Sequence, residues 1–254
     1  MESYRPNPLL RDRVVSIERV LSHGHTSQVL PSTGAVLGLQ ISGRILGPDG
    51  PLSTLGVTGI PDSVRRYSYE GPTETFLVRF QPQGAACLGI PGDRIRGQSL
   101  ALDDLWEGRR RAQAAQLMSA LHGCVDTTRR VALLEEFLMS LPFRRDMRLE
   151  RALQRLDRSD HLDEAANVAG VARELGLSER QLERLFRERV GISPKRYVRL
   201  RRFERAVKLT RELGSLSAVA SVSGYADQAH FIRDFRSFTG TTPRRYVQAS
   251  DFVM

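Results

Sequence analysis

The chain of 254 residues is poor in cysteine and has no long hydrophobic run, and each shortage excludes a class of protein. Two cysteines, Cys87 and Cys124, are too few for a disulfide framework or a four-cysteine zinc site, and we expect both to be buried reduced thiols. The longest stretch without charge, residues 20–43, is interrupted by polar residues, proline and glycine, which makes it a poor membrane span. The opening residues, MESYRPNPLLRDR, lack the layout of a secretory signal. We therefore expect a soluble, cytoplasmic protein with no membrane partner.

Positive charge is concentrated in the C-terminal part of the chain. The formal net charge is +9, from 38 Lys and Arg against 29 Asp and Glu. Residues 1–142 hold 15 Arg and 14 acidic residues, a net of +1, so residues 143–254 hold the other 23 basic and 15 acidic residues, a net of +8. A basic half beside a near-neutral half is typical of a protein that meets a polyanion, although a solvated surface would have the same composition.

Turn-forming residues divide the chain into two architectures. Up to about residue 100, short apolar or alternating runs such as AVLGLQISGRIL and TETFLVRF are separated by segments with Gly and Pro, which predicts strands. Helical spacing dominates afterwards. We predict an α+β fold, with a β-rich domain over residues 1–141 that ends in a helical connector (101–141) and an all-α domain over residues 143–254.

Capping residues and glycines place the helices of the C-terminal domain. The expected helices cover residues 147–158, 162–175, 179–190, 194–213, 215–223, 228–239 and a last segment opened by Thr242-Pro243. Ser178 and Gln181 form a predicted capping box, and Asp227 is the corresponding cap later in the chain. Ser193-Pro194 predicts a cap followed by proline at the first helical position.

A twelve-residue segment occurs twice, as FRERVGISPKRY (186–197) and FRSFTGTTPRRY (235–246). Each copy ends a unit of short helix, glycine turn and capped helix, the layout of a helix-turn-helix. Arg184 and Arg187 recur 49 residues later as Arg233 and Arg236, opposite the apolar face of each capped helix. Arginine suits guanine edges and phosphates. Surface arginines are common in so Arg-rich a chain, but two such stripes behind a glycine turn and a cap indicate binding to double-stranded DNA.

The long helix between the two units would act as a spacer. About 20 residues of helix span about 30 Å, close to the roughly 34 Å between successive major-groove entries on one face of a duplex. We therefore expect the unit to be repeated because the site is read in two adjacent grooves. The helix carries many basic residues, some expected on phosphates and others paired with acids such as Glu204 and Glu212. These basic residues are Lys195, Arg196, Arg199, Arg201, Arg202, Arg205, Lys208 and Arg211.

The segment GYADQAHFIRDFRSFTGTTPRRY (224–246) follows a long and specific pattern, and residues 165–246 resemble the DNA-binding domain of AraC/XylS-type transcriptional regulators. The resemblance implies seven helices, with two helix-turn-helix units joined by a linker helix. The residues that it implies for contact with bases are Arg180, Gln181, Arg184, Arg187, Gln228, His230 and Arg233. Further candidates for DNA contact are Ser178, Lys195, Ala229 and Arg236. Ala229 departs from the family, because its side chain offers only a methyl contact, so the second unit is expected to read less sequence or to depend on backbone contacts.

The same resemblance implies a divergent sensing or dimerising domain, often a cupin-like β-barrel, before the DNA-binding domain. FLVRFQPQGAACLGIP (76–91) followed by LDDLW (102–106) resembles a degenerate barrel of one subgroup, with Trp106 expected to anchor the connector helix. His23 and His25 form an H-x-H pair, but no acid follows before Asp49, and a metal site needs three or four ligands. We expect no metal and no cofactor. Tyr67, Tyr69 and Arg79 either line an effector pocket or are packing residues.

The leading hypothesis is a bacterial transcription regulator, not an enzyme, that binds promoter DNA through both units and is modulated by its N-terminal domain. RNA polymerase, a small-molecule effector and a second copy of the chain are candidate partners. A DNA-binding module fused to an enzyme is the main alternative. A metalloenzyme would need His23 and His25 as ligands, and an alkylation-repair protein would need more than two cysteines. A regulator that senses a protein partner and has no small ligand is the third alternative.

Overall fold

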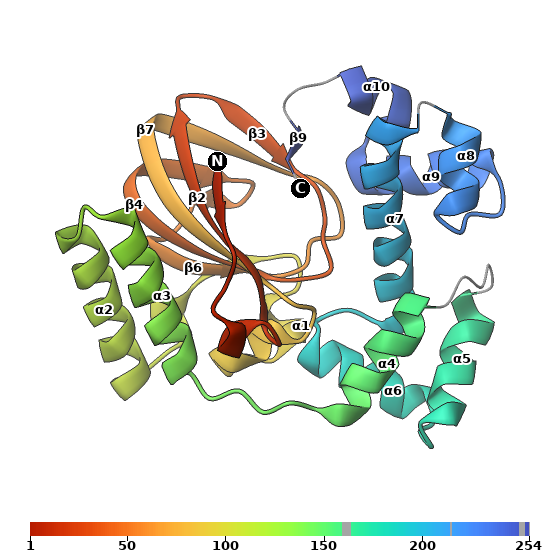
Figure 1. Cartoon of the computed structure of the whole chain (residues 1–254), viewed down its shortest axis with the longest axis horizontal. Coiled ribbons are helices and arrows are strands. Elements are labelled where there is room, and N and C mark those ends of the chain that lie inside the picture. The colour runs from red at the N-terminus through yellow and green to blue at the C-terminus, as the bar shows by residue number, and fades with distance from the viewer. Residues whose placement is uncertain (159–163, 214, 249–251, 254) are drawn as a thin grey trace.

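The computed structural model describes residues 1–158, 164–213, 215–248 and 252–253, and places an antiparallel sheet beside a bundle of helices (Figure 1). The strands run in the order β1-β2-β7-β4-β6-β8, with β3 paired to β7 and β5 to β4. Their bounds are Glu2–Tyr4 (β1), Val14–His23 (β2), Thr26–Val29 (β3), Val36–Gly47 (β4), Gly50–Pro51 (β5), Leu55–Thr58 (β6), Arg65–Phe80 (β7) and Ser99–Ala101 (β8). Short helical turns occupy Pro8–Leu10 (η1), Gly84–Leu88 (η2), Gly92–Ile95 (α1) and Leu102–Asp104 (η3). The predicted α+β fold is confirmed.

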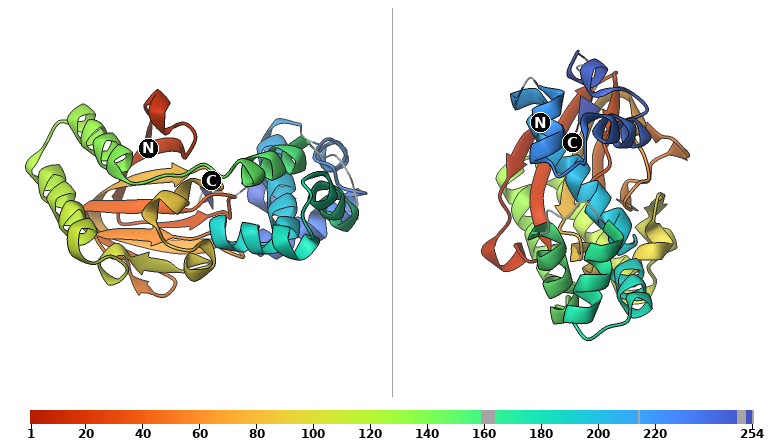
Figure 2. Two further views of the ribbon diagram at one scale, coloured as in Figure 1. Left: turned by 90° about the horizontal axis from the view of Figure 1, so that it is seen from below. Right: turned by 90° about the vertical axis from the view of Figure 1, so that its right-hand side faces the viewer.

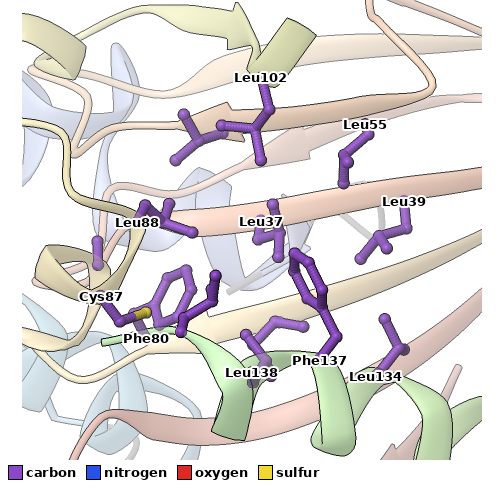
Figure 3. Packing of buried hydrophobic residues seen from close by; sticks show 14 of the residues in the cluster. Leu37, Leu39, Leu55, Phe80, Cys87, Leu88, Leu102, Leu134, Phe137 and Leu138 are labelled. Carbon is purple, nitrogen blue, oxygen red and sulfur yellow. The ribbon is translucent and has the colours of Figure 1, made fainter. Parts of the chain in front are cut away.

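Two helices, α2 (Gly108–Gly123) and α3 (Thr127–Ser140), cover one face of this sheet. Side chains alternate along a strand, so Leu37 and Leu39 of β4 and Phe80 of β7 point to the same core as Leu134 and Leu138 of α3 (Figure 3). The alternate side chains of β4 and β7, among them Gln40, Thr75 and Leu77, line a cavity on the other face of the sheet. Figure 2 shows the sheet between the α2–α3 pair at one end and the C-terminal helices at the other.

Residues 101–141 do not bridge the two halves, which differs from the connector expected there. Trp106 is buried, donates its indole N–H to the Leu88 carbonyl (2.9 Å) and packs against Phe137 of α3, with ring centroids 6.2 Å apart. Trp106 anchors α2 and α3 against the sheet, as predicted, so both helices are part of the N-terminal core. The chain crosses instead through residues 142–146, which form neither helix nor strand.

The expectation that both thiols are buried is correct for Cys87 and wrong for Cys124. Cys87 has no exposed surface, and burial raises the pKa of its thiol to about 12. Cys124 is half-buried, because it follows the last residue of α2 in the turn that leads to α3.

The C-terminal half is helical as predicted, except for a short strand at its end. Its described helices are Met147–Arg158 (α4), Glu164–Glu174 (α5), Glu179–Arg189 (α6), Pro194–Glu212 (α7), Leu216–Val222 (α8), Gln228–Thr239 (α9) and Pro243–Gln248 (α10). Each agrees with its predicted range within one or two residues; residues 162–163 and Gly214 of those predictions lie outside the described residues. A last short strand, β9 (Phe252–Val253), pairs in parallel with β3. In the described part of the chain no helix is both long and apolar enough to cross a membrane.

Candidate nucleic-acid interface and ligand cavity

The first helix-turn-helix unit consists of α5 and α6. Gly176 takes a positive φ of 66° at the turn, and Ser178 then caps α6 by accepting a hydrogen bond from the Gln181 N–H at 3.2 Å. The Gln181 side-chain oxygen accepts in return from the Ser178 N–H at 2.8 Å, which completes the predicted capping box. Leu182 and Phe186 are fully buried, so α6 has a fixed inner face and a fixed start.

The second unit repeats this design with α8 and α9. Gly224 turns the chain with a φ of 81°, and the Asp227 carboxylate accepts from the His230 N–H at 2.6 Å. Phe231, Phe235 and Phe238 form the fully buried face of α9. The predicted caps and apolar faces of both units are therefore confirmed.

The residues shared by the two copies of the repeated segment encode a packing unit. Phe186 meets Tyr197 edge-on at a centroid distance of 5.7 Å and an angle of 65°, and Phe235 meets Tyr246 at 5.4 Å and 63°. Each pair joins a recognition helix to the next helix, α7 or α10, across a turn. Edge-to-face rings of this kind add to the free energy gained by burial. The repeat thus fixes how each unit ends.

The outward faces of α6 and α9 carry most of the residues predicted to contact DNA. Exposed side chains on these helices, and at the starts of α6 and α7, are Ser178, Arg180, Gln181, Arg184, Arg187, Lys195, Gln228, Ala229, Arg233 and Arg236. His230 differs, because it is half-buried with its ring edge-on to Tyr225 at 5.2 Å. Ser178 and the Gln181 oxygen are engaged in the cap, so Gln181 presents its amide nitrogen.

Ion pairs on these faces are weak and exposed. Arg187 pairs with Glu183 at 2.8 Å, and Arg184 lies 3.9 Å from Glu188, both at i,i+4 spacing. Such pairs stabilise a helix by only about 0.3–0.5 kcal/mol. They therefore leave both guanidinium groups available to DNA at low cost.

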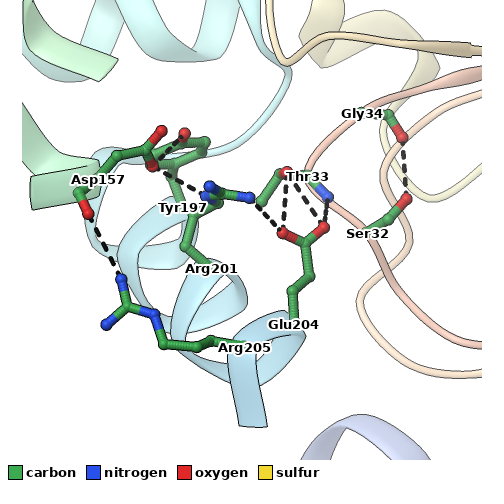
Figure 4. A network of polar contacts seen from close by, with 8 residues as sticks. All are labelled: Ser32, Thr33, Gly34, Asp157, Tyr197, Arg201, Glu204 and Arg205. Atoms are coloured by element: carbon green, nitrogen blue, oxygen red, sulfur yellow. Dashed lines mark hydrogen bonds and ion pairs between the residues drawn. The ribbon is translucent and has the colours of Figure 1, made fainter. Parts of the chain in front are cut away.

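Most of the described arginines of α7 are half-buried and engaged in contacts within the protein, unlike those on the exposed faces of α6 and α9. Arg196 lies 4.4 Å from the Phe238 ring centroid, Arg202 lies over Tyr225, and Arg199 pairs with Asp234. Burial lowers the pKa of the Arg196 guanidinium. Arg201 donates to both Asp157 and Glu204, each at 2.9 Å (Figure 4). Among the basic residues of α7 whose burial is described, Lys195 and Lys208 are exposed.

Two loops of the sheet hold α7. The buried Glu204 carboxylate accepts from the Thr33 N–H at 2.7 Å and from its hydroxyl at 3.1 Å (Figure 4). Arg196 donates to the Asp62 carbonyl, and its guanidinium lies 3.8 Å from the Asp62 carboxylate. The Val64 N–H donates to the Phe238 carbonyl at 2.7 Å. These three contacts, which we call the α7 contacts, join the N-terminal half to both the linker helix and α9.

A cavity of about 540 Å³ opens on the sheet face that α2 and α3 leave uncovered. Its walls include Val36, Gly38 and Gln40 of β4 and Thr75, Leu77 and Arg79 of β7. Gly38 and Gly56 are opposite one another on β4 and β6, and their lack of side chains deepens the hollow. The size is that of a site for one small molecule.

The cavity contains buried polar atoms without hydrogen-bond partners in the described structure. They are the Gln40 side-chain oxygen, the Thr75 hydroxyl and the Arg65 Nε. Gln40 and Thr75 are opposite each other on β4 and β7. A buried polar group without a partner costs about 1–3 kcal/mol, so a ligand that supplied the missing bonds would recover that free energy.

Tyr67, Tyr69 and Arg79 also line the cavity, so the structure brings the three candidate pocket residues together. Arg79 is already paired with Glu18 at 2.9 Å. His25 lines the wall beside them, with its ring 5.1 Å from that of Tyr69 and a contact of 3.1 Å to the Ser22 hydroxyl. Among the described residues no three His, Cys, Asp or Glu side chains gather as they would around a metal. Sequence reasoning missed Gln40 and Thr75, although polar residues at inward positions of two paired strands are a usable signal.

Each unit has the layout of a helix-turn-helix, with a short helix, a glycine turn and a capped helix, and comparison with known proteins agrees. The family model for a helix-turn-helix domain matches residues 171–249. The transcriptional activator RhaS of Escherichia fergusonii is 33% identical over 122 residues, which cover 48% of this chain and 43% of RhaS. The regulator GbdR of Pseudomonas aeruginosa is 36% identical over 85 residues, 33% of this chain and 23% of GbdR. The chain thus spans less than half the length of these curated relatives.

A solved structure extends the likeness to the N-terminal half. ToxT from Vibrio cholerae aligns with 91% of this chain and 98% of its own, with a TM-score of 0.50 and 13% identity, which is a likeness of fold. The helix-turn-helix domain is of the AraC type, like that of these relatives. The resemblance read from the signature in residues 224–246 is confirmed.

The capping box gives the first prediction. Ser178→Ala removes the acceptor for the Gln181 N–H and should lower the free energy of unfolding by about 1 kcal/mol, whereas Ser178→Asp should retain most of it. Urea denaturation of the full chain measures both variants. Ser221→Ala, at an exposed position of α8, is the matched control and should change little. Equal stability of the Ser178→Ala and Ser221→Ala variants would contradict the capping role.

Proposed function

We propose that the protein is a sequence-specific transcription regulator, not an enzyme, that reads two adjacent major grooves with α6 and α9. The observation that carries the proposal is the pair of capped helices with buried inner faces and exposed basic outer faces, both packed on one linker helix. RhaS and GbdR, which share this domain, are named as a transcriptional activator and a transcriptional regulator. Contact with RNA polymerase, pairing of two chains through residues 1–141 and a cytoplasmic location belong to the same proposal.

The proposed base-reading residues point outward from α6 and α9, and the ion pairs that they make within the protein are exposed and weak. Arg180, Arg184 and Arg187 of α6 and Arg233 of α9 have the length and donors to reach base edges. Ser178, Lys195 and Arg236 are better suited to phosphates, because they lie at the starts of helices or at the far end of α9. His230 is half-buried against Tyr225, and Ala229 offers a methyl group, so the second unit reads fewer bases than the first.

Replacement of Arg184 separates base reading from phosphate binding. Arg184→Ala should weaken binding to a selected duplex by about 1–3 kcal/mol while changing binding to random duplex far less. Fluorescence anisotropy with the two duplexes at one salt concentration measures the difference. Arg109→Ala, which removes an exposed charge from α2, should leave both affinities close to those of the wild type. An equal loss on selected and random DNA would assign Arg184 to the phosphates.

We further propose that a small molecule in the sheet cavity modulates DNA binding. The cavity rim includes Leu30, Ser32 and Gly34 from one loop and Gly59 and Pro61 from another. Thr33 and Asp62, which make two of the α7 contacts, lie in these same loops. A ligand that shifts either loop would therefore strengthen or weaken the α7 contacts. To do so, it must bind one arrangement of the loops better than the other.

The ligand chemistry that fits is a mostly apolar molecule with a few donors and acceptors. Leucine, isoleucine, valine and proline make up much of the wall, while Gln40, Thr75 and Arg65 offer unfilled polar atoms. Arg65 and Arg79 already have acidic partners, Asp49 and Glu18. The cavity has no uncompensated charge at these two positions, which favours a neutral polar head over a strongly charged one.

Filling the cavity tests the proposed effector site. A Cβ added at Gly38 would meet only the Gly56 carbonyl and the Leu77 side chain, each at 3.9 Å, so Gly38→Leu projects into the cavity without a backbone clash. The variant should fold and bind DNA but lose the thermal shifts that small metabolites give the wild type. Gly123→Leu, at the open end of α2, is the control and should keep those shifts. Shifts retained in the Gly38→Leu variant would contradict the site, and their absence in the wild type would favour a regulator that senses a protein partner.

A further inference from the structure

A second groove, of about 560 Å³, lies where the segment joining the two halves meets the first recognition helix. We call it the α4–α6 groove, because its walls come from residues 144–148, around the start of α4, and from α6 with Leu177 just before it. It contains five arginines, namely Arg144, Arg145, Arg148, Arg184 and Arg189. Its acidic residues are Asp146 and Glu188, so the groove has a net charge of +3.

Only part of this positive charge is compensated within the protein. Arg145 is held by Glu150 through two hydrogen bonds of 2.6 Å, and Arg184 lies 3.9 Å from Glu188. Asp146 is used as the cap of α4, where it accepts from the Arg148 N–H at 3.0 Å.

The three remaining arginines are Arg144, Arg148 and Arg189, and none of them forms an ion pair with another residue that the structure describes. All three are exposed. Like charges gathered in one groove repel each other unless an anion lies between them.

The groove is continuous with the surface proposed to read bases. Gln181 and Arg184 of α6 form part of its wall. A recognition helix in the major groove is bordered on each side by a sugar-phosphate strand, and the elements beside the helix make the backbone contacts that set its position. Arg144 of the joining segment and Arg148 of α4 lie across the groove from α6.

We propose that Arg144, Arg148 and Arg189 bind DNA backbone phosphates beside the major groove that α6 enters, so that the segment joining the two halves is part of the DNA interface. This inference rests on the proposed DNA-binding function. It also gives the N-terminal half a short route to the bound DNA. Glu150, which holds Arg145, also accepts a hydrogen bond from Gln83 of the N-terminal half at 3.2 Å.

The test compares two double variants of the full chain that remove the same charge. Arg144→Ala with Arg148→Ala removes two groove arginines, whereas Arg109→Ala with Arg111→Ala removes two exposed arginines from α2. Fluorescence anisotropy on a random-sequence duplex and on a selected duplex, between about 50 and about 200 mM NaCl, gives the slope of log affinity against log salt. The groove variant should lower that slope by about 2, close to 1 for each phosphate that the protein no longer neutralises, and equally on both duplexes.

Three results bear on the inference. Replacing both groove arginines by lysine should restore most of the slope, because a phosphate contact needs charge more than the planar guanidinium. An unchanged slope in the alanine variant would overturn the inference and assign the groove to another anion, such as an acidic protein surface. An equal fall in the α2 control would overturn it too, because bulk charge would then explain the effect.

A wild-type protein that binds DNA but prefers no sequence would count against the proposed function alone, since the random duplex still tests the groove.

Discussion

The burial of α7 is the constraint on which the rest of the structure depends. Leu200, Phe203 and Ala206 have no exposed surface, and Phe203 stacks against Phe235 and Phe238 of α9 at centroid distances of 5.4 and 4.6 Å. Nearer the start of α7, Tyr197 packs against Phe186 of α6. Both recognition helices are therefore fastened to one rod through aromatic contacts. Close-packed interiors resist small displacements, so these contacts with α7 hold α6 and α9 at a fixed separation.

The same helix is where the N-terminal half meets the reading surfaces. Glu204 is a buried carboxylate, and a buried charge is tolerated when it is paired and hydrogen-bonded. Thr33 from the sheet and Arg201 from α7 supply those bonds, and Asp157 of α4 accepts from Arg201 and Tyr197 in turn (Figure 4). Removing Thr33 from this network would leave part of the Glu204 charge without a partner. The loops that carry Thr33 and Asp62 also line the cavity, so the cavity and the linker helix lie on two sides of the same few residues.

Local signals made the C-terminal half predictable from the sequence. The caps Ser178, Ser193 and Asp227 act over three residues, so a pattern of serine, glycine and proline is enough to find where α6, α7 and α9 begin. The outward arginines of α6 and α9 follow from the helical period once those starts are known. The paired Phe and Tyr of the repeated segment were visible as identities, but their edge-on contact between consecutive helices is a tertiary feature.

What could not be predicted depends on contacts between distant segments. The arginines of α7 look alike in sequence, yet Arg202 is buried over Tyr225 and Lys195 is exposed. His230 is half-buried because Tyr225 packs beside it, and α2 and α3 join the sheet because Trp106 ties them to it. Two glycines that line the cavity, Gly38 and Gly56, meet only when β4 pairs with β6.

The measurement that tests the central claim most directly is an unbiased selection of random duplex DNA by the full-length protein. If α7 holds α6 and α9 in successive major grooves, the enriched duplexes should contain two short blocks of preferred bases, with centres about 10 base pairs apart. The block read by α6 should be the better defined. A single block, a variable spacing between blocks, or binding without any enriched sequence would contradict the account of α7 as a rigid spacer between two reading helices.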